Sequence, residues 1–220
     1  MDDFEQILAG AGVAVSRRAL DAAYEASGTE LGRIWSSHRD VPVEHHISAI
    51  LKAAGADVAD QIGPTERTAL VEAYVRPALL VPPAVDPGAR AALEALRARG
   101  YTLVLVSNTM RTPGTTLRKL LDRYGVLGLF AHTTFSDEVG IRKPAPEIFA
   151  LSLRAVGGDA ATALHVGDDL VLDVEGARAA GLRVIHVRTT SGQPPVGQKA
   201  DAVIGNLADL PAAVAGLDVG

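Results

Sequence analysis

The sequence predicts an α/β protein in which a parallel sheet follows a helical N-terminal part. Two observations support this prediction. Apolar residues recur at helical spacing throughout residues 1–80, and no β-rich run appears before Tyr101. From there on, short apolar runs rich in branched residues alternate with helical segments, which is typical of right-handed crossovers between parallel strands. The run YTLVLVS (101–107) has the composition of a strand covered on both faces.

Three amphipathic segments make up the N-terminal part. Ser16 is expected to cap the first helix, which passes through Leu20 and Leu31. The second helix is expected over residues 43–54 and should end at Gly55. The third should begin at Pro64 and stop near Pro77.

Residues 81–220 are expected to form the sheet and the helices that cover it. After the helix over 89–99, which ends at Gly100, the expected strands cover residues 101–107, 132–136, 163–167, 183–187 and 201–205. The expected helices cover residues 115–124, 146–156, 174–180 and a final segment through Leu210 and Val214. The segment 189–198 (TTSGQPPVGQ) is expected to be a flexible loop.

Composition narrows the function classes. Hydrophobic residues make up 48% and charged residues 21% of the 220 residues, which is an ordinary balance for a globular protein. The net charge of −5 gives no basic surface for nucleic acid or an anionic membrane. The chain has no cysteine, which excludes disulfides, thiolate catalysis and Cys-ligated zinc. No apolar run is long enough for a membrane span, and the acidic N-terminus is unlike a signal peptide, so we expect a cytoplasmic protein.

Polar residues follow the predicted strands at the points where each strand ends. In a doubly wound sheet, ligands bind beyond the carboxyl ends of the strands. Hydroxyl and amide donors, a lysine and several carboxylates would therefore converge on one edge: Ser107 and Asn108, Lys143, and Asp168, Asp169 and Asp173. Such a set suits a phosphate bound together with a hard divalent cation.

Each of these residues also has an ordinary structural interpretation. Ser107 and Asn108 can form a strand-to-turn pair, and Lys143 before a proline can be a solvated loop lysine. Asp168 and Asp169 can belong to a turn that caps a helix, and Asp173 can favour the positive end of that helix. Their common position directly after predicted strands favours a functional site.

Three segments resemble motifs II, III and IV of the haloacid dehalogenase (HAD) superfamily: LVLVSN (103–108), SDEVGIRKPAPEIF (136–149) and HVGDDLVLDVEGARAAG (165–181). The resemblance implies a Rossmann-like core over residues 81–220 and a helical cap over residues 1–80. It also implies a phosphatase-type hydrolase that uses Mg²⁺ and acts on a small phosphorylated substrate.

The resemblance assigns a role to each residue. Ser107 would donate a hydrogen bond to a phosphoryl oxygen, and Asn108 would shape the same edge. Lys143 would neutralise the charge of the nucleophile and the phosphoryl group. Asp168 would hold Mg²⁺ directly or through water, Asp173 would support that shell, and Asp169 would be an auxiliary ligand only.

The first motif of the superfamily, an apolar strand that ends in Asp-x-Asp, has no counterpart in this sequence. Asp2 and Asp3 are adjacent, and alternating side chains of a strand share a side only two residues apart. By the resemblance, the absent strand would lie between the strands at 103–107 and 163–167. Either those two strands pair directly, or another strand fills the gap, or the natural protein begins upstream of Met1. We expect a truncated reading frame, with a natural degenerate homologue as the alternative.

Three functions are consistent with these residues. The first is a Mg²⁺-dependent phosphomonoester hydrolase, strongly impaired because it lacks the nucleophilic aspartate and binds Mg²⁺ weakly. The second is a non-catalytic module that binds a phosphorylated ligand or a partner. The third is a haloacid dehalogenase, which the acidic group at Asp168 and Asp173 disfavours because halide displacement needs no magnesium. Exposed strand edges would also favour a homodimer.

Overall fold

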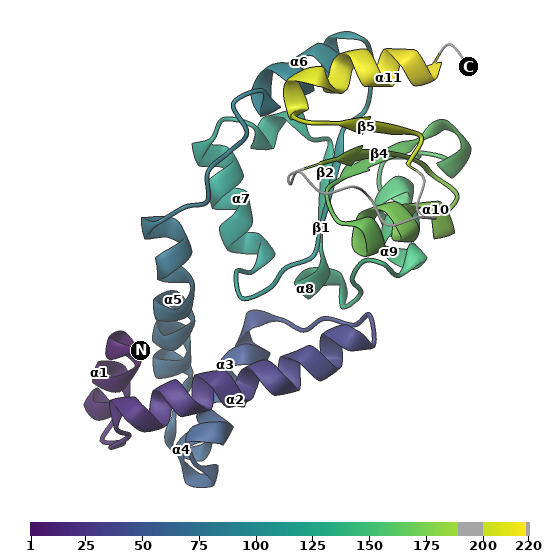
Figure 1. The fold of residues 1–220 in the computed structure, drawn as a ribbon. Coiled ribbons are helices and arrows are strands. Elements are labelled where there is room, and N and C mark those ends of the chain that lie inside the picture. Colours follow the sequence, from purple (N-terminus) through teal and green to yellow (C-terminus); the bar gives the residue numbers. More distant parts are fainter. Residues whose placement is uncertain (189–199, 219–220) are drawn as a thin grey trace.

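The computed structural model describes residues 1–188 and 200–218. Figure 1 shows the N-terminal helices as a lobe set apart from an α/β part, with α5 leading from one to the other. The loop expected over 189–198 lies outside the described residues. Among the described residues, no helix is long and apolar enough to cross a bilayer.

The helical lobe contains α1 to α5, which cover Asp2–Gly10, Arg17–Ser36, Val43–Ala54, Ala56–Gln61 and Pro64–Leu80. Its core is a cluster of buried aliphatic and aromatic side chains, among them Leu8, Leu20, Ile50 and Leu70. Burial of one such side chain stabilises a fold by about 1.5–3 kcal/mol, so this cluster holds the short helices together.

Two details of the lobe test the predicted helix ends. Ser16 caps α2 as predicted, since its hydroxyl accepts a hydrogen bond from the backbone N–H of Ala19 at 3.3 Å. The predicted stop near Pro77 is wrong, because α5 continues to Leu80 with Pro77 inside it. The helix survives this proline close to its end, where the Pro77 carbonyl still accepts a bond from the N–H of Val81 at 2.9 Å.

The α/β part has five short strands, β1 to β5, which cover Val104–Ser107, His132–Phe135, Leu164–Gly167, Arg183–Val187 and Ala202–Ile204. Each lies within or matches a predicted strand. The helices are α6 to α11, which cover Ala89–Ala98, Gly114–Arg123, Ser136–Val139, Pro146–Arg154, Gly176–Ala179 and Leu210–Asp218. Short turns of other helix types complete the chain: η1 Leu127–Leu129, η2 Ala160–Thr162, η3 Leu170–Glu175 and η4 Leu207–Asp209. The helix predicted from residue 174 starts earlier, as the π-helical segment η3.

The strands form two separate parallel sheets. One contains β1 and β2 and the other contains β3, β4 and β5 in that order. Within the described residues, β1 does not pair with β3 and no strand lies between them. Direct pairing of these two strands and filling of the gap by another strand are therefore not found within the described residues.

Helices cover both faces of the three-stranded sheet. On one face α6 and α11 pack against the sheet in a cluster that includes Leu96, Ile185 and Leu210. On the other face α9, η3 and α10 form a second cluster around Phe149 and Val184. Because successive strand residues point to opposite faces, neighbours such as Val184 and Ile185 enter different clusters.

A buried carboxylate, Asp40, joins the helical lobe to the α/β part. One of its oxygens accepts a hydrogen bond from Trp35 Nε1 at 2.9 Å within the lobe. The other accepts from Ser136 Oγ, Thr109 Oγ1 and Arg142 Nη1 across the interface. The side chain of Asp40 is 0% exposed and that of Arg142 is 7% exposed, so this ion pair is almost fully removed from water.

Replacing Asp40 by Asn should strongly destabilise the protein. The change leaves the Arg142 guanidinium buried without its counter-charge, and breaking such a pair costs about 3–5 kcal/mol. Urea unfolding measures the loss. The matched control is Asp3→Asn, which removes an exposed ion pair to Arg76 and should cost less than about 1 kcal/mol. Equal effects of the two substitutions would contradict the importance given to Asp40.

Candidate active site at the carboxyl ends of the strands

The residues predicted from motifs II and III meet through the side chain of Asn108. Its amide nitrogen donates to the carbonyl of Lys143 at 2.9 Å, and its amide oxygen accepts from the Lys143 N–H at 2.7 Å. This two-point bond fixes the Lys143 backbone beside the end of β1, where Ser107 is the last strand residue. In this structure Asn108 therefore positions the lysine, and both polar atoms of its amide are used in these two hydrogen bonds.

The lysine in turn meets the carboxylate of Asp173. Lys143 Nζ lies 2.5 Å from Asp173 Oδ1, and the two side chains are only 11% and 5% exposed. His165 Nε2 lies 2.8 Å from the same oxygen, and the backbone N–H of Asp169 donates to Asp173 Oδ2 at 3.0 Å. One carboxylate thus gathers segments from three places in the chain.

The surroundings of Asp173 strongly favour its ionised form. Burial alone would raise its pKa, but the hydrogen bond from His165 and the nearby charge of Lys143 outweigh that effect. The pKa of Asp173 is held well below its usual range. The ammonium and the carboxylate are therefore a fixed pair at neutral pH.

His165 belongs to this site although the sequence analysis did not select it. It lies on β3, and its ring packs edge-on against Phe149 at 5.0 Å between centroids. The available signal was a single histidine inside the otherwise apolar strand segment ALHV. A titratable ring in such a strand has to find a polar partner, and Asp173 supplies it.

Gly167 is required by the position of Asp173. A Cβ atom at Gly167 would lie 2.2 Å from the Asp173 carboxyl carbon, which is far inside any normal contact. Only glycine lets the carboxylate reach under the end of β3. The Gly-Asp-Asp sequence therefore has a steric reason in addition to its turn chemistry.

The other two predicted acidic residues, Asp168 and Asp169, differ in their contacts. Asp169 caps η3, because its Oδ1 accepts from the N–H groups of Val171 and Leu172 at 2.8 Å each. Asp168 is exposed, and within the described residues its backbone carbonyl contacts the side chain of His186. The ordinary interpretation, a helix cap, thus holds for Asp169.

These carboxylates do not form a ready magnesium site. Among the described residues, no three acidic or histidine side chains gather closely enough to hold a metal ion. Asp173 is engaged by Lys143, and Asp169 by the backbone that it caps. Since Mg²⁺ requires near-octahedral oxygen ligands, the one carboxylate available here, Asp168, is an incomplete set.

A second contact between the lobe and the α/β part lies beside the site. Arg111, in the loop after β1, stacks over the ring of Tyr24 at 3.8 Å and donates to the hydroxyl of Tyr74 at 3.1 Å. The same hydroxyl contacts His46 Nδ1 at 3.2 Å. This aromatic group links the loop that carries Asn108 to three helices of the lobe.

His46 is buried and uncharged. Its Nε2 has no hydrogen-bond partner in the described structure, and burial lowers its pKa to about 4. His45, next to it on α3, instead reaches Glu30 at the surface of the lobe. Both histidines have structural surroundings.

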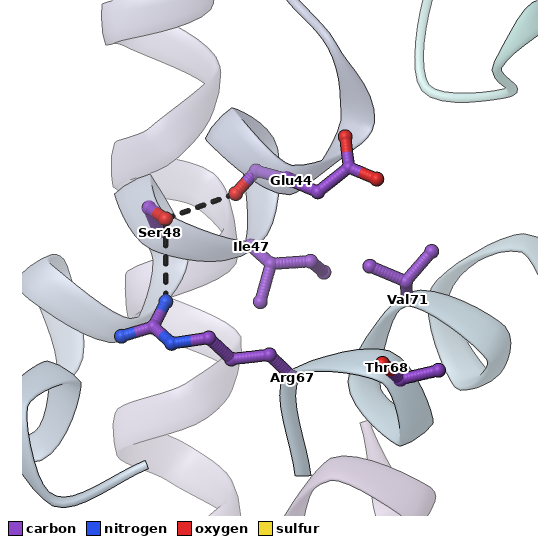
Figure 2. Close-up of a pocket in the computed structure, with 6 residues that line it drawn as sticks. All are labelled: Glu44, Ile47, Ser48, Arg67, Thr68 and Val71. Carbon is purple, nitrogen blue, oxygen red and sulfur yellow. Dashed lines mark hydrogen bonds between the residues drawn. The ribbon is translucent and has the colours of Figure 1, made fainter. Parts of the chain in front are cut away.

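A small hollow in the lobe, shown in Figure 2, contains none of the predicted site residues. Arg67 borders it, but its guanidinium donates to Ser48 Oγ and to the carbonyls of Ile62 and Ala59. Arg67 thus holds α4 and α5 in place. The hollow has a volume of about 170 Å³, and we assign it no ligand.

Asp173→Asn should change how stability depends on pH in metal-free buffer. Because the folded pKa of Asp173 is depressed, its ionised form stabilises the protein above the unfolded pKa of about 3.9. That contribution is lost as pH falls from there toward the folded pKa. The stability difference between wild type and variant, measured by urea unfolding, should be largest near pH 7 and shrink below pH 4. A difference that does not change with pH would contradict the pairing.

The burial of His46 makes a separate prediction at milder pH. The unfolded chain binds a proton near pH 6.5, whereas the folded one does so only near pH 4. Stability should therefore fall as pH is lowered across this window, by about 3 kcal/mol in total. Comparing His46→Gln with its neighbour His45→Gln measures this, since only the His46 variant should lose that pH-dependent component.

Relatives of the chain are phosphatases. It is 34% identical over 171 residues to the phosphoserine phosphatase of Thermus thermophilus, covering 77% of this chain and 62% of that protein. It is 37% identical over 130 residues to a phosphoglycolate phosphatase of Cupriavidus necator, covering 58% of this chain and 54% of that one. The matched segments therefore span roughly half of these relatives.

The fold has close counterparts among solved structures. A 2-haloacid dehalogenase from Pseudomonas syringae superposes with a TM-score of 0.67, covering 98% of this chain and 89% of that one at 24% identity. At that identity the likeness concerns the fold alone. The family model of haloacid dehalogenase-like hydrolases matches residues 5–181. With that match over most of its length, the chain belongs to the haloacid dehalogenase-like hydrolase family.

Proposed function

We propose that the site serves phosphomonoester hydrolysis on a small phosphorylated substrate, with residues 1–80 as the cap and residues 81–220 as the catalytic core. The observation that carries this proposal is the fixed Lys143 ammonium beside the end of β1. A buried cation that cannot move away from a strand end is suited to neutralise phosphoryl charge. The similarity to phosphatases supports the same substrate class.

Each residue has a separate task in this proposal. Ser107 donates a hydrogen bond from its hydroxyl to a phosphoryl oxygen, and Lys143 balances the charge that gathers on the phosphoryl group. Asn108 acts through Lys143, since both ends of its amide bind the lysine backbone. Asp173 and His165 hold the lysine side chain in place.

Magnesium enters this proposal only as a weakly bound ion. Bound there, it would supply positive charge to the phosphoryl oxygens. Asp168 would hold it directly or through water, while Asp173 and Asp169 would lie in its surroundings. Because two of these three carboxylates are already engaged, we expect weak affinity.

The chain also lacks a carboxylate placed to attack phosphorus. No Asp-x-Asp occurs in the sequence, and Lys143 cannot replace it because its task is electrostatic. Attack would fall to water that no described carboxylate activates. We therefore propose that residues 1–220 alone hydrolyse phosphate esters far more slowly than a complete enzyme of this family.

The second candidate is a module that binds a phosphorylated ligand without turning it over. The engaged carboxylates favour it, since Asp173 is paired with Lys143 and the described residues form no complete metal site. Both candidates share Ser107 and Lys143. Only a rate measurement separates them.

Hydrolysis of p-nitrophenyl phosphate with Mg²⁺ tests the proposal. We expect the present chain to be several orders of magnitude slower than the same chain preceded by an apolar strand ending in Asp-x-Asp, because loss of a nucleophile leaves only binding and electrostatics. In the extended chain, Lys143→Met should lower kcat about 10²–10³-fold. The exposed Lys119→Met is its matched control and should change nothing.

Two results would contradict the proposal. Fast turnover by the present chain that survives Lys143→Met would place the chemistry elsewhere. An extended chain that folds, binds phosphate and yet hydrolyses no member of a wide substrate panel would favour the binding module. Asp168→Ala in the extended chain should weaken the dependence of rate on Mg²⁺.

A further inference from the structure

Among the described residues, Arg111 has no acidic partner, although its side chain is half-buried between the helical lobe and the α/β part. It lies in the loop between β1 and α7, on the side of the α/β part that faces the lobe (Figure 1). Two other arginines of this region differ in that respect, since Arg142 pairs with Asp40 and Arg118 pairs with Glu138. The charge of Arg111 is therefore the unbalanced one.

Neutral groups of the lobe hold the Arg111 guanidinium in place. Nη1 donates to the Tyr74 hydroxyl at 3.1 Å and to Ser27 Oγ at 3.5 Å, and Nη2 donates to the Tyr24 carbonyl at 3.3 Å. The ring of Tyr24 stacks against the guanidinium at 3.8 Å. Burial raises the pKa of Tyr74, so its hydroxyl keeps its proton at neutral pH and brings no negative charge.

The wider surroundings of Arg111 also leave its charge in place. His46, which shares the Tyr74 hydroxyl, is uncharged at neutral pH, because burial and then the nearby Arg111 charge lower its pKa to about 4. Gly28 on α2 makes room for the guanidinium, since a Cβ atom there would lie 3.0 Å from Arg111 Nη2. The Nε–H of Arg111 makes no hydrogen bond within the described residues. A ligand could therefore use both this donor and the charge.

Arg111 is close in the chain to the proposed phosphoryl position. Three peptide steps separate it from Asn108, so their Cα atoms lie at most about 11 Å apart. Asn108 holds the backbone of Lys143, and Ser107 precedes it directly. One short loop thus connects the cation proposed to bind phosphate with a second, unbalanced cation at the border of the lobe.

We propose that Arg111 binds a carboxylate on the leaving group of the substrate, so that the site selects small phosphate esters with a second negative charge. This inference rests on the proposed function, because it takes the phosphoryl group to lie at Ser107 and Lys143. The planar guanidinium matches the two oxygens of a carboxylate. A neutral leaving group would leave a half-buried charge uncompensated, whereas a carboxylate supplies the missing counter-charge.

Two stable phosphonates test the proposal by binding alone. Phosphonoacetate carries the carboxylate, and phosphonoacetamide replaces it by a neutral amide of the same shape. Neither is a phosphate ester, so the probes do not depend on turnover. In calorimetry with the present chain, we expect phosphonoacetate to have a dissociation constant at least tenfold lower. Lys143→Met should weaken both ligands by a similar factor, because both carry the phosphonate.

A matched pair of arginine variants locates the carboxylate. Arg111→Met should reduce the preference for phosphonoacetate to less than twofold and leave the affinity for phosphonoacetamide within twofold. Arg118→Met should keep the full preference, since Arg118 also stacks over an aromatic ring, that of Phe135, but is neutralised by Glu138. The preference is a ratio of two affinities in one protein, so a loss of stability does not imitate it.

A milder variant covers the case in which Arg111→Met does not fold. Arg111→Lys keeps the charge but loses the planar pair of donors, and it should lower the preference at least threefold. Thermal unfolding, followed by circular dichroism, checks that each variant is folded at the temperature of the binding measurement.

The outcomes separate this inference from the proposed function. Equal affinity of the unaltered chain for the two phosphonates, lost for both in Lys143→Met, would overturn the role of Arg111 and leave the phosphoryl site standing. Absence of binding of either ligand at millimolar concentration would overturn both. A preference that survives Arg111→Met in a less stable protein would show that Arg111 only fastens the lobe to the α/β part.

Discussion

The buried carboxylate of Asp173 organises the site. It binds the Lys143 ammonium, the His165 ring and the backbone N–H of Asp169, which come from separate segments. Burial opposes its charge, and these partners more than offset that penalty. Because the three segments can satisfy the carboxylate only together, the loops at the strand ends are tied to one another.

The helical lobe depends on a second carboxylate of the same kind. Asp40 accepts hydrogen bonds from the loops that follow β1 and β2, and Arg111 adds an aromatic contact to the lobe. The loop that carries Asn108 is thus held between the lobe and Lys143. Changes in how the lobe sits would therefore reach the residues proposed to bind phosphate through short, well-defined contacts.

Both the sheet and the proposed catalytic site are incomplete, and the two gaps lie next to each other. The sheet is divided between β1 and β3, and the site lies at the carboxyl ends of these strands. An apolar cavity lies between the two sheets, and among the described residues Lys143 is paired with Asp173.

The sequence by itself determined the element order, the parallel strands and the grouping of Lys143 with Asp173, because periodicity and strand ends are local signals. Asp169 was also recognisable as part of a turn that caps a helix. Only the tertiary structure decided that Asn108 binds the lysine backbone, that His165 joins the site and that Asp40 joins the two parts. Those contacts connect residues whose partners, apart from that of His165, lie some 30 to 100 positions away, and local sequence carries no record of which buried polar groups will meet.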